Sequence, residues 1–142
     1  MEVVETADWD LVFDLQGRFS ADDPNDMKPM GREAFDALAT GRTNAFIAYD
    51  GQRPVGVALL MDLDGATALN AFTGVERAAR GRGIAKLLKL NVIARARRNG
   101  VSRLVTQNNS QNAPMLKVNQ WLGYDRRPGV WILRNPTPTA AP

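Results

Sequence analysis

The feature that most constrains this chain is a long apolar strand that runs through a glycine-containing turn into a basic helix. Small and apolar residues predict a strand from Ala66 to Val75, and Arg80-Gly81-Arg82-Gly83 leads into a helix from Ile84 to Asn99. Gly100 is placed to end that helix, and Leu104-Val105-Thr106 predicts a following strand buried on both faces. The helix should turn its apolar residues inward and its lysines and arginines outward; the inward set is Ile84, Leu87, Leu88 and Ile93.

The rest of the pattern predicts helices and strands on either side of this unit. Residues 1–135 should form a single domain of the α/β (α+β) class, with a mixed, mostly antiparallel central sheet flanked by helices. Residues 136–142 contain repeated proline and predict a flexible tail. The other expected elements are a short strand at Val3-Val4, helices Asp8–Phe19, Arg32–Ala39 and Ala113–Leu122, and strands Ala45–Tyr49, Val55–Met61, Tyr124–Arg127 and Val130–Leu133.

The absence of cysteine and histidine narrows the chemistry that the chain can perform. It excludes thiolate zinc sites, cysteine nucleophiles and imidazole bases, so catalysis must use carboxylates, hydroxyls, amides, backbone N–H groups or water. We therefore expect no metal, and transfer from an already activated donor fits the inventory. No apolar run is long enough to span a bilayer and no secretory signal is recognisable, so we expect a cytoplasmic protein without a membrane partner.

Basic residues gather between Arg77 and Arg103, which favours a polyanionic ligand there. That ligand could be nucleic acid or a nucleotide-like cofactor, and a solvated helix face is the third alternative. The chain lacks the interleaved aromatic residues and recognition motifs of nucleic-acid binders, so we expect no nucleic-acid partner. A nucleic-acid surface would have to use Arg80, Arg82, Lys86, Lys89, Arg95, Arg97 and Arg98.

The turn between Val75 and Ala85 is suited to a phosphate or pyrophosphate. Its glycines let the backbone approach a ligand closely, and the first N–H groups of the following helix carry the positive end of the helix dipole. The spacing fits neither the dinucleotide-binding glycine motif nor the phosphate loop of ATPases. The alternative is an ordinary loop with solvated arginines.

Arg80-x-x-Gly83-x-Ala85 resembles the acyl-CoA pyrophosphate loop of the GNAT N-acetyltransferase superfamily. Val75 stands where that family has a valine at the end of a strand. Other segments in the expected order resemble the family's fifth strand, its pantetheine-side asparagine and the end of its fourth helix; they are Thr106-Gln107-Asn108, Asn112, Met115 and Leu122-Gly123-Tyr124.

The resemblance implies acetyl-CoA as co-substrate and assigns residues to it. Backbone groups around Phe72, Thr73, Gly74 and Val75 would hydrogen-bond the pantetheine arm. Asn108 and Asn112 would lie near the pantetheine and the thioester, although Asn112 can also serve as the N-cap of its helix. The pyrophosphate would be held by Arg80, Gly81, Arg82, Gly83, Ile84 and Ala85.

Two positions depart from the family's pattern. Asn119 stands where many members have a tyrosine that acts as general acid, and in this it resembles the subgroup containing mycothiol-synthase-type domains. We expect Asn119 to hydrogen-bond the thioester sulfur; the alternative is that it faces solvent. Thr67 stands where some relatives have a glutamate base, so the base is unassigned, with Asp62 and Asp64 as the nearest candidates or as ordinary turn residues.

These features predict an N-acetyltransferase that moves an acetyl group from acetyl-CoA to an amine of a small-molecule acceptor, by direct attack in a ternary complex. The acidic segment with Asp22, Asp23 and Asp26 could attract a cationic amine or simply form a turn. The alternative function is a non-catalytic acyl-CoA-binding sensor, or one half of a tandem acetyltransferase. A homodimer is left open.

Overall fold

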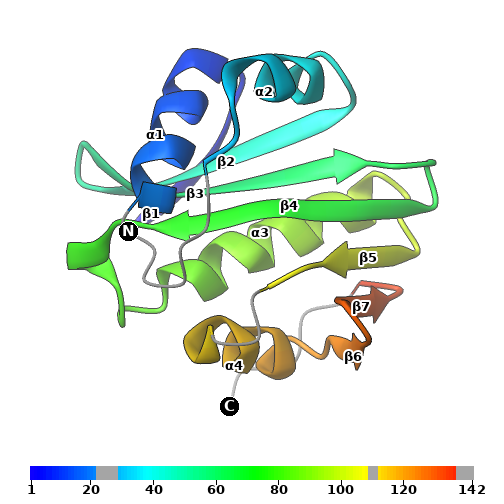
Figure 1. Ribbon diagram of the computed structural model, residues 1–142. Coiled ribbons are helices and arrows are strands. Elements are labelled where there is room, and N and C mark those ends of the chain that lie inside the picture. Colours follow the sequence, from blue (N-terminus) through cyan, green and yellow to red (C-terminus); the bar gives the residue numbers. More distant parts are fainter. Residues whose placement is uncertain (22–28, 109–111, 137–142) are drawn as a thin grey trace.

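A computed structural model describes residues 1–21, 29–108 and 112–136 of the chain. Over these ranges a single sheet with the strand order β1-β2-β3-β4-β5-β7-β6 forms the centre of the molecule, and helices lie against both of its faces (Figure 1). The elements are β1 (Glu2–Thr6), α1 (Trp9–Ala21), α2 (Arg32–Ala39), β2 (Thr43–Asp50), β3 (Arg53–Asp62), β4 (Thr67–Val75), a 3-10 turn (Arg77–Ala79), α3 (Ile84–Arg98), β5 (Arg103–Thr106), α4 (Ala113–Trp121), β6 (Asp125–Arg127) and β7 (Val130–Arg134).

The sheet confirms the predicted fold class. Strands β1 to β4 form an antiparallel meander, β5 joins β4 in parallel after the α3 crossover, and β7 pairs antiparallel with both β5 and β6. A parallel pair needs a crossover between its strands, and α3 supplies it. The sheet is therefore mixed but mostly antiparallel.

The buried apolar residues divide into two clusters on the two faces of the sheet. The α1-side core lies under α1 and α2 and consists of Val12, Leu15, Phe19, Phe35, Ala45, Ile47, Val57 and Leu59. The α3-side core consists of Phe46, Ala48, Val55, Ala58, Leu60, Ala68, Val75, Ala79, Ile84, Leu88, Val92, Ile93, Ala96, Val101, Leu104, Leu122, Tyr124 and Leu133.

Local contacts are seen at the start of both α3 and α4. A Cβ atom at Gly56 would lie 2.8 Å from Leu88 Cδ1 and 3.0 Å from Ile84 Cγ2, so any larger residue there would displace these side chains at the start of α3. The α4 helix has Asn112 as its N-cap, and the Asn112 side chain accepts a hydrogen bond from Met115 N. Both helices thus begin where the local sequence predicts.

Two expectations about burial are wrong. Lys89 does not face outward with the other basic residues of α3, because it is only 1% exposed and lies on the face that packs against the sheet. Strand β5 is not buried on both faces: Leu104 and Thr106 are buried but Val105 is half-buried. The α1-side core draws its strand residues from β2 and β3, so the helices above it do not cover β5.

Some expectations concern residues outside the described part of the chain. These are the acidic segment with Asp22, Asp23 and Asp26, and residues 137–142 of the expected tail. Pro136, the first residue of that tail, is buried. No helix in the described ranges is both long and apolar enough to cross a membrane.

Candidate functional site

The site opens where β4 and β5 separate. The two strands pair only from Thr67 opposite Arg103 to Asn70 opposite Thr106, whereas β4 continues to Val75. The last residues of β4 therefore have β3 on one side and no strand on the other within the described residues. A cavity of about 700 Å³ lies beside this edge.

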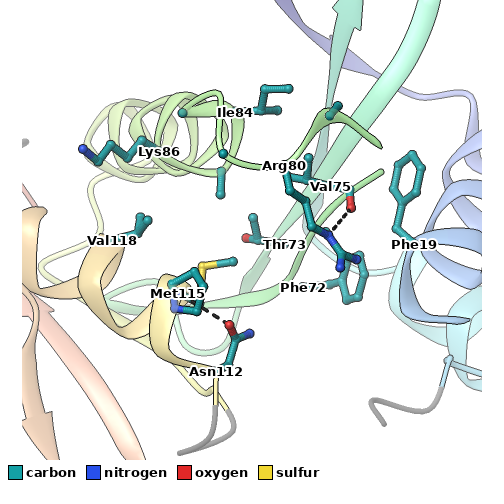
Figure 2. Close-up of a pocket in the computed structure, with 16 residues that line it drawn as sticks. Phe19, Phe72, Thr73, Val75, Arg80, Ile84, Lys86, Asn112, Met115 and Val118 are labelled. Atoms are coloured by element: carbon teal, nitrogen blue, oxygen red, sulfur yellow. Dashed lines mark hydrogen bonds between the residues drawn. The ribbon is translucent and has the colours of Figure 1, made fainter. Parts of the chain in front are cut away.

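The cavity is walled by several segments of the chain, as Figure 2 shows. Strand β4, the turn after it, the first residues of α3 and one face of α4 surround it, and α1 closes one end with Phe19. A single site thus joins elements far apart in the sequence. The lining residues are Phe19, Phe72, Thr73, Gly74, Val75, Ala79, Arg80, Gly81, Gly83, Ile84, Ala85, Lys86, Asn112, Pro114, Met115 and Val118.

The turn before α3 presents backbone rather than side chains to the cavity. Gly81 and Gly83 have φ angles of 81° and 78°, in the left-handed region that favours glycine. Gly83 is also the N-cap of α3 and provides no side-chain cap, so the N–H groups of the first turn can be donated to a ligand. Arg80 Nε donates to Val75 O at 3.2 Å and ties the turn to the end of β4 (Figure 2).

The charge of the lining is positive. Among the described lining residues Arg80 and Lys86 are cationic, and none is aspartate or glutamate. Lys86 Nζ lies 4.5 Å from the centre of the Trp121 ring, at the side of the cavity next to α4. Such a lining favours an anionic ligand.

Most of the residues assigned to the cofactor from the sequence line this cavity. Phe72 to Val75 do so from β4, and Arg80, Gly81, Gly83, Ile84 and Ala85 do so from the turn. Asn112 both lines the cavity and caps α4, so its two expected roles are compatible. Arg82 and Asn108 are not among the lining residues.

Arg82 instead pairs with Asp50 at the end of β2, with 3.0 Å between Nη1 and Oδ2. The Arg82 guanidinium lowers the pKa of the Asp50 carboxyl from its ordinary value. Arg95 likewise pairs with Glu5, and Lys89 is buried. The basic residues of this region are therefore divided among the cavity, surface ion pairs and the core.

Asn119 is buried, with 0% of its surface exposed, so the alternative that it faces solvent is wrong. Its Nδ2 donates to Asn108 Oδ1 at 2.6 Å, and its Oδ1 has no hydrogen-bond partner among the described residues. Neither asparagine lines the cavity. The pair nevertheless connects α4 to the residues that follow β5.

The candidate bases lie away from the cavity. Thr67 is at the start of β4, at the opposite end from the lining residues. Asp62 Oδ1 accepts from Gly65 N at 2.7 Å, and Asp64 Oδ1 accepts from Thr67 N at 2.6 Å. Both carboxylates therefore act as turn residues in this structure.

A buried polar cluster lies between α3 and β5. Lys89 Nζ donates to Thr106 Oγ1 at 3.3 Å and lies 5.4 Å from the centre of the Tyr124 ring. Burial lowers the pKa of Lys89 to about 7 and raises the pKa of the Tyr124 hydroxyl above its ordinary value. Sequence reasoning missed this cluster and also missed Phe19, Pro114 and Val118 of the cavity, because no local motif marks them.

Comparisons with known proteins agree with this architecture. The ribosomal-protein-S18-alanine N-acetyltransferase of Escherichia coli has a TM-score of 0.74 at 15% identity, covering 99% of this chain and 97% of that one. A GNAT family acetyltransferase from Elizabethkingia anophelis, solved with acetyl-CoA bound, has a TM-score of 0.69 at 16% identity, covering 93% and 97%. A Bacillus subtilis acetyltransferase in complex with CoA has a TM-score of 0.68 at 20% identity, covering 89% and 76%.

These identities are low, so the likeness shows a shared fold. No curated protein matched the chain. The sequence pattern of the acetyltransferase (GNAT) family, however, matches residues 9–124, which span most of the chain and include the whole cavity lining. The chain therefore belongs to the acetyltransferase (GNAT) family.

Proposed function

We propose that this protein binds acetyl-CoA in the cavity beside β4 and transfers the acetyl group to the amine of a small-molecule acceptor. The observation that carries the proposal is the junction of the unpaired β4 edge with the uncapped glycine turn of α3 in one positively lined cavity. A peptide-like arm next to a pyrophosphate, as in CoA, matches this combination of a strand edge and an anion-binding helix start. The related protein solved with acetyl-CoA supports it.

The residues present fit such a ligand. Backbone groups of Phe72 to Val75 would take the amides of the pantetheine arm, because no neighbouring strand uses that edge in the described residues. The turn from Arg80 to Ala85 would take the pyrophosphate. Lys86 would add positive charge on the α4 side of the cavity, where its Nζ lies over the Trp121 ring. Arg82 would contribute through its backbone, because its side chain is paired with Asp50.

Bound acetyl-CoA would supply an activated acyl group. The acceptor nitrogen would bond to the carbonyl carbon as the carbon–sulfur bond breaks. The amine would lose one proton and the CoA thiolate would take up one proton, so that the products are the amide and free CoA. The protein holds the two reactants together in a ternary complex, which lowers the entropic cost of their encounter. Proton removal from the amine needs a base, and no described lining residue is a carboxylate. Either a water chain or an acidic group elsewhere in the protein would take this proton, so the base stays unassigned.

Asn119 would assist the leaving sulfur through Asn108. Asn119 Nδ2 donates one of its two hydrogens to Asn108 Oδ1 and so holds the Asn108 amide, whose own Nδ2 would be the donor toward the sulfur. Asn119 is then the positioning member of the pair. The same residue supports the proposed likeness to mycothiol-synthase-type domains.

A non-catalytic acyl-CoA sensor, or one half of a tandem enzyme, is the second candidate. Two observations favour it: an amide stands where a phenol is common in the family, and the described lining lacks a carboxylate.

The cytoplasmic location, the single domain over residues 1–135 and a homodimer also stay predictions. A protein acceptor is the competing substrate class, because the Escherichia coli relative is named for an alanine of a ribosomal protein.

The test is a screen for release of free CoA from acetyl-CoA with polyamines, aminoglycosides, amino acids and peptides with free N-termini. We expect turnover with at least one small amine and none with N-blocked peptides. Turnover only with peptide N-termini would contradict the small-molecule assignment. Binding of acetyl-CoA without turnover across the panel would favour the sensor.

A further inference from the structure

The second half of β4 is set out of phase with the first by a single extra residue. Leu59 of β3 pairs with Phe72, and the next β3 residue, Leu60, pairs with Asn70, so Ala71 is inserted between them as a β-bulge. Such an insertion changes which face of the sheet the following side chains occupy.

The packing of β4 shows that exchange of faces. Ala68, before the bulge, belongs to the α3-side core, and strict alternation would put Phe72 on the same face. Instead Ala71 and Phe72 both pack against the α1-side core, and Val75 belongs to the α3-side core. The bulge therefore determines how Phe72, Thr73 and Val75 meet the cavity.

The Asn70 side chain is bonded on both sides of this bulge. Its Nδ2 donates to Leu59 O and to Phe72 O, each at 3.0 Å, and its Oδ1 accepts from Thr73 Oγ1 at 3.2 Å. Asn70 is 3% exposed, so these bonds replace water that is excluded. Both amide hydrogens and the amide oxygen are used within the bulge.

Asn70 is also the last residue of β4 that pairs with β5. Its partner Thr106 contacts Asn70 O through Oγ1 at 3.5 Å and accepts a hydrogen bond from the buried Lys89 Nζ. Two contacts therefore meet where β4 and β5 separate. Lys89 of α3 bonds to Thr106 of β5, and the Asn70 side chain bonds within the β4 bulge. Beyond this point every β4 residue from Phe72 to Val75 lines the cavity.

We propose that Asn70 is a positioning residue for the ligand cavity: its amide locks the β4 bulge and so fixes the orientation of the Phe72–Val75 edge. It does not line the cavity and acts through Phe72 and Thr73. The effect on ligand affinity rests on the proposed binding of CoA, whereas the effect on β4 does not depend on it.

The experiment compares Asn70→Ala with Ile47→Ala, a fully buried β2 position that packs in the α1-side core and does not line the cavity. Each folded variant is measured for thermal stability, for CoA affinity by calorimetry, and for hydrogen exchange of residues 71–75 without ligand. We expect both variants to lose stability. Only Asn70→Ala should lose about tenfold or more in CoA affinity and exchange faster at residues 71–75.

The inference is overturned if Asn70→Ala behaves like Ile47→Ala, that is, if its CoA affinity and its hydrogen exchange at residues 71–75 are both unchanged. If the wild-type protein does not bind CoA, the proposed function fails, and the exchange comparison still decides the role of Asn70. Should Asn70→Ala not fold, Thr73→Val removes only the hydroxyl that donates to Asn70 Oδ1. Exchange at residues 71–75 should then rise, and unchanged exchange would equally overturn the inference.

Discussion

At the scale of single residues, Lys89 is the most unusual member of the core. It is buried without a carboxylate within salt-bridge distance among the described residues, and it contacts a hydroxyl and an aromatic ring. The Tyr124 ring offsets a fraction of the cost of burying its charge, but desolvation dominates and lowers its pKa to about 7 from an ordinary value of 10.5. The folded protein therefore binds this proton more weakly than the unfolded chain does.

Lys89→Met should stabilise the protein, and the gain should depend on pH. Below pH 7 Lys89 is protonated in both the folded and the unfolded protein, so the full cost of the buried charge is present. Between pH 7 and 10.5 Lys89 stays protonated only in the unfolded protein, so the stability of the wild-type protein rises with pH. The gain should thus be largest below pH 7, on the order of a few kcal/mol, and shrink toward pH 10.5. Denaturant unfolding at several pH values measures it. The exposed Lys117→Met is the control, and a pH-independent gain would contradict the assignment.

Asn119 and Asn108 should act as one unit in catalysis. If Asn119 orients the donor to the leaving sulfur, Asn119→Ala should lower kcat by roughly tenfold to a thousandfold, the range for an aligned donor, with little change in KM for acetyl-CoA. Asn108→Ala should have a similar effect, and the double variant should be no worse than either single variant. Steady-state kinetics on an acceptor found by the screen would measure this. A lower melting temperature with an unchanged kcat would mean that the pair is structural.

At the scale of secondary-structure elements, the turn before α3 requires glycine because of its backbone conformation and not because a side chain would clash there. A Cβ atom at Gly83 would meet no atom within 4 Å, yet its φ of 78° disfavours other residues. Gly51, in the β2–β3 turn, has the same properties, with φ of 64° and no atom within 4 Å, but lies outside the cavity lining. The two positions therefore form a matched pair.

Gly83→Asp should weaken CoA binding far more than Gly51→Asp does. Both substitutions impose a similar backbone strain of about 1 kcal/mol, but only that at Gly83 puts a carboxylate where a pyrophosphate would approach the helix N–H groups. We expect at least a tenfold loss of affinity by calorimetry for Gly83→Asp and an unchanged affinity for Gly51→Asp. Equal CoA affinity in a folded Gly83→Asp variant would remove this turn from the site.

At the scale of the whole molecule, the cavity exists because the sheet divides into two sections. Strands β2 and β3 supply the buried strand residues of the α1-side core, and β5 separates from β4 beyond Asn70 (Figure 1). Strand β4, the start of α3 and one face of α4 each supply some of the lining. A ligand that binds there holds these elements together.

Acetyl-CoA should accordingly stabilise the whole fold. A ligand at roughly a hundred times its dissociation constant adds about 2.7 kcal/mol, which corresponds to a rise of several degrees in melting temperature for a domain of this size. Differential scanning fluorimetry with acetyl-CoA, longer acyl-CoAs and adenosine monophosphate as control would measure it. An unchanged melting temperature with every acyl-CoA would contradict the proposed function.

Local sequence was sufficient to predict the elements and the turn that form one wall of the site. Helix α3, its glycine start and the cap of α4 at Asn112 were predicted because periodicity, glycine and capping act within a few residues of each other. The parallel pairing of β4 and β5 also follows from the helix between them, since a parallel pair requires such a crossover.

Tertiary structure decided the features that depend on residues distant in the sequence. The burial of Lys89 depends on Thr106 and Tyr124, and the bulge at Asn70 depends on Leu59 in the neighbouring strand. Phe19 reaches the cavity because α1 packs over β4, which no local pattern encodes. A pattern of 3.6 or 2 residues predicts an element and its buried face, but it does not specify which distant side chain satisfies a buried amide or ammonium group.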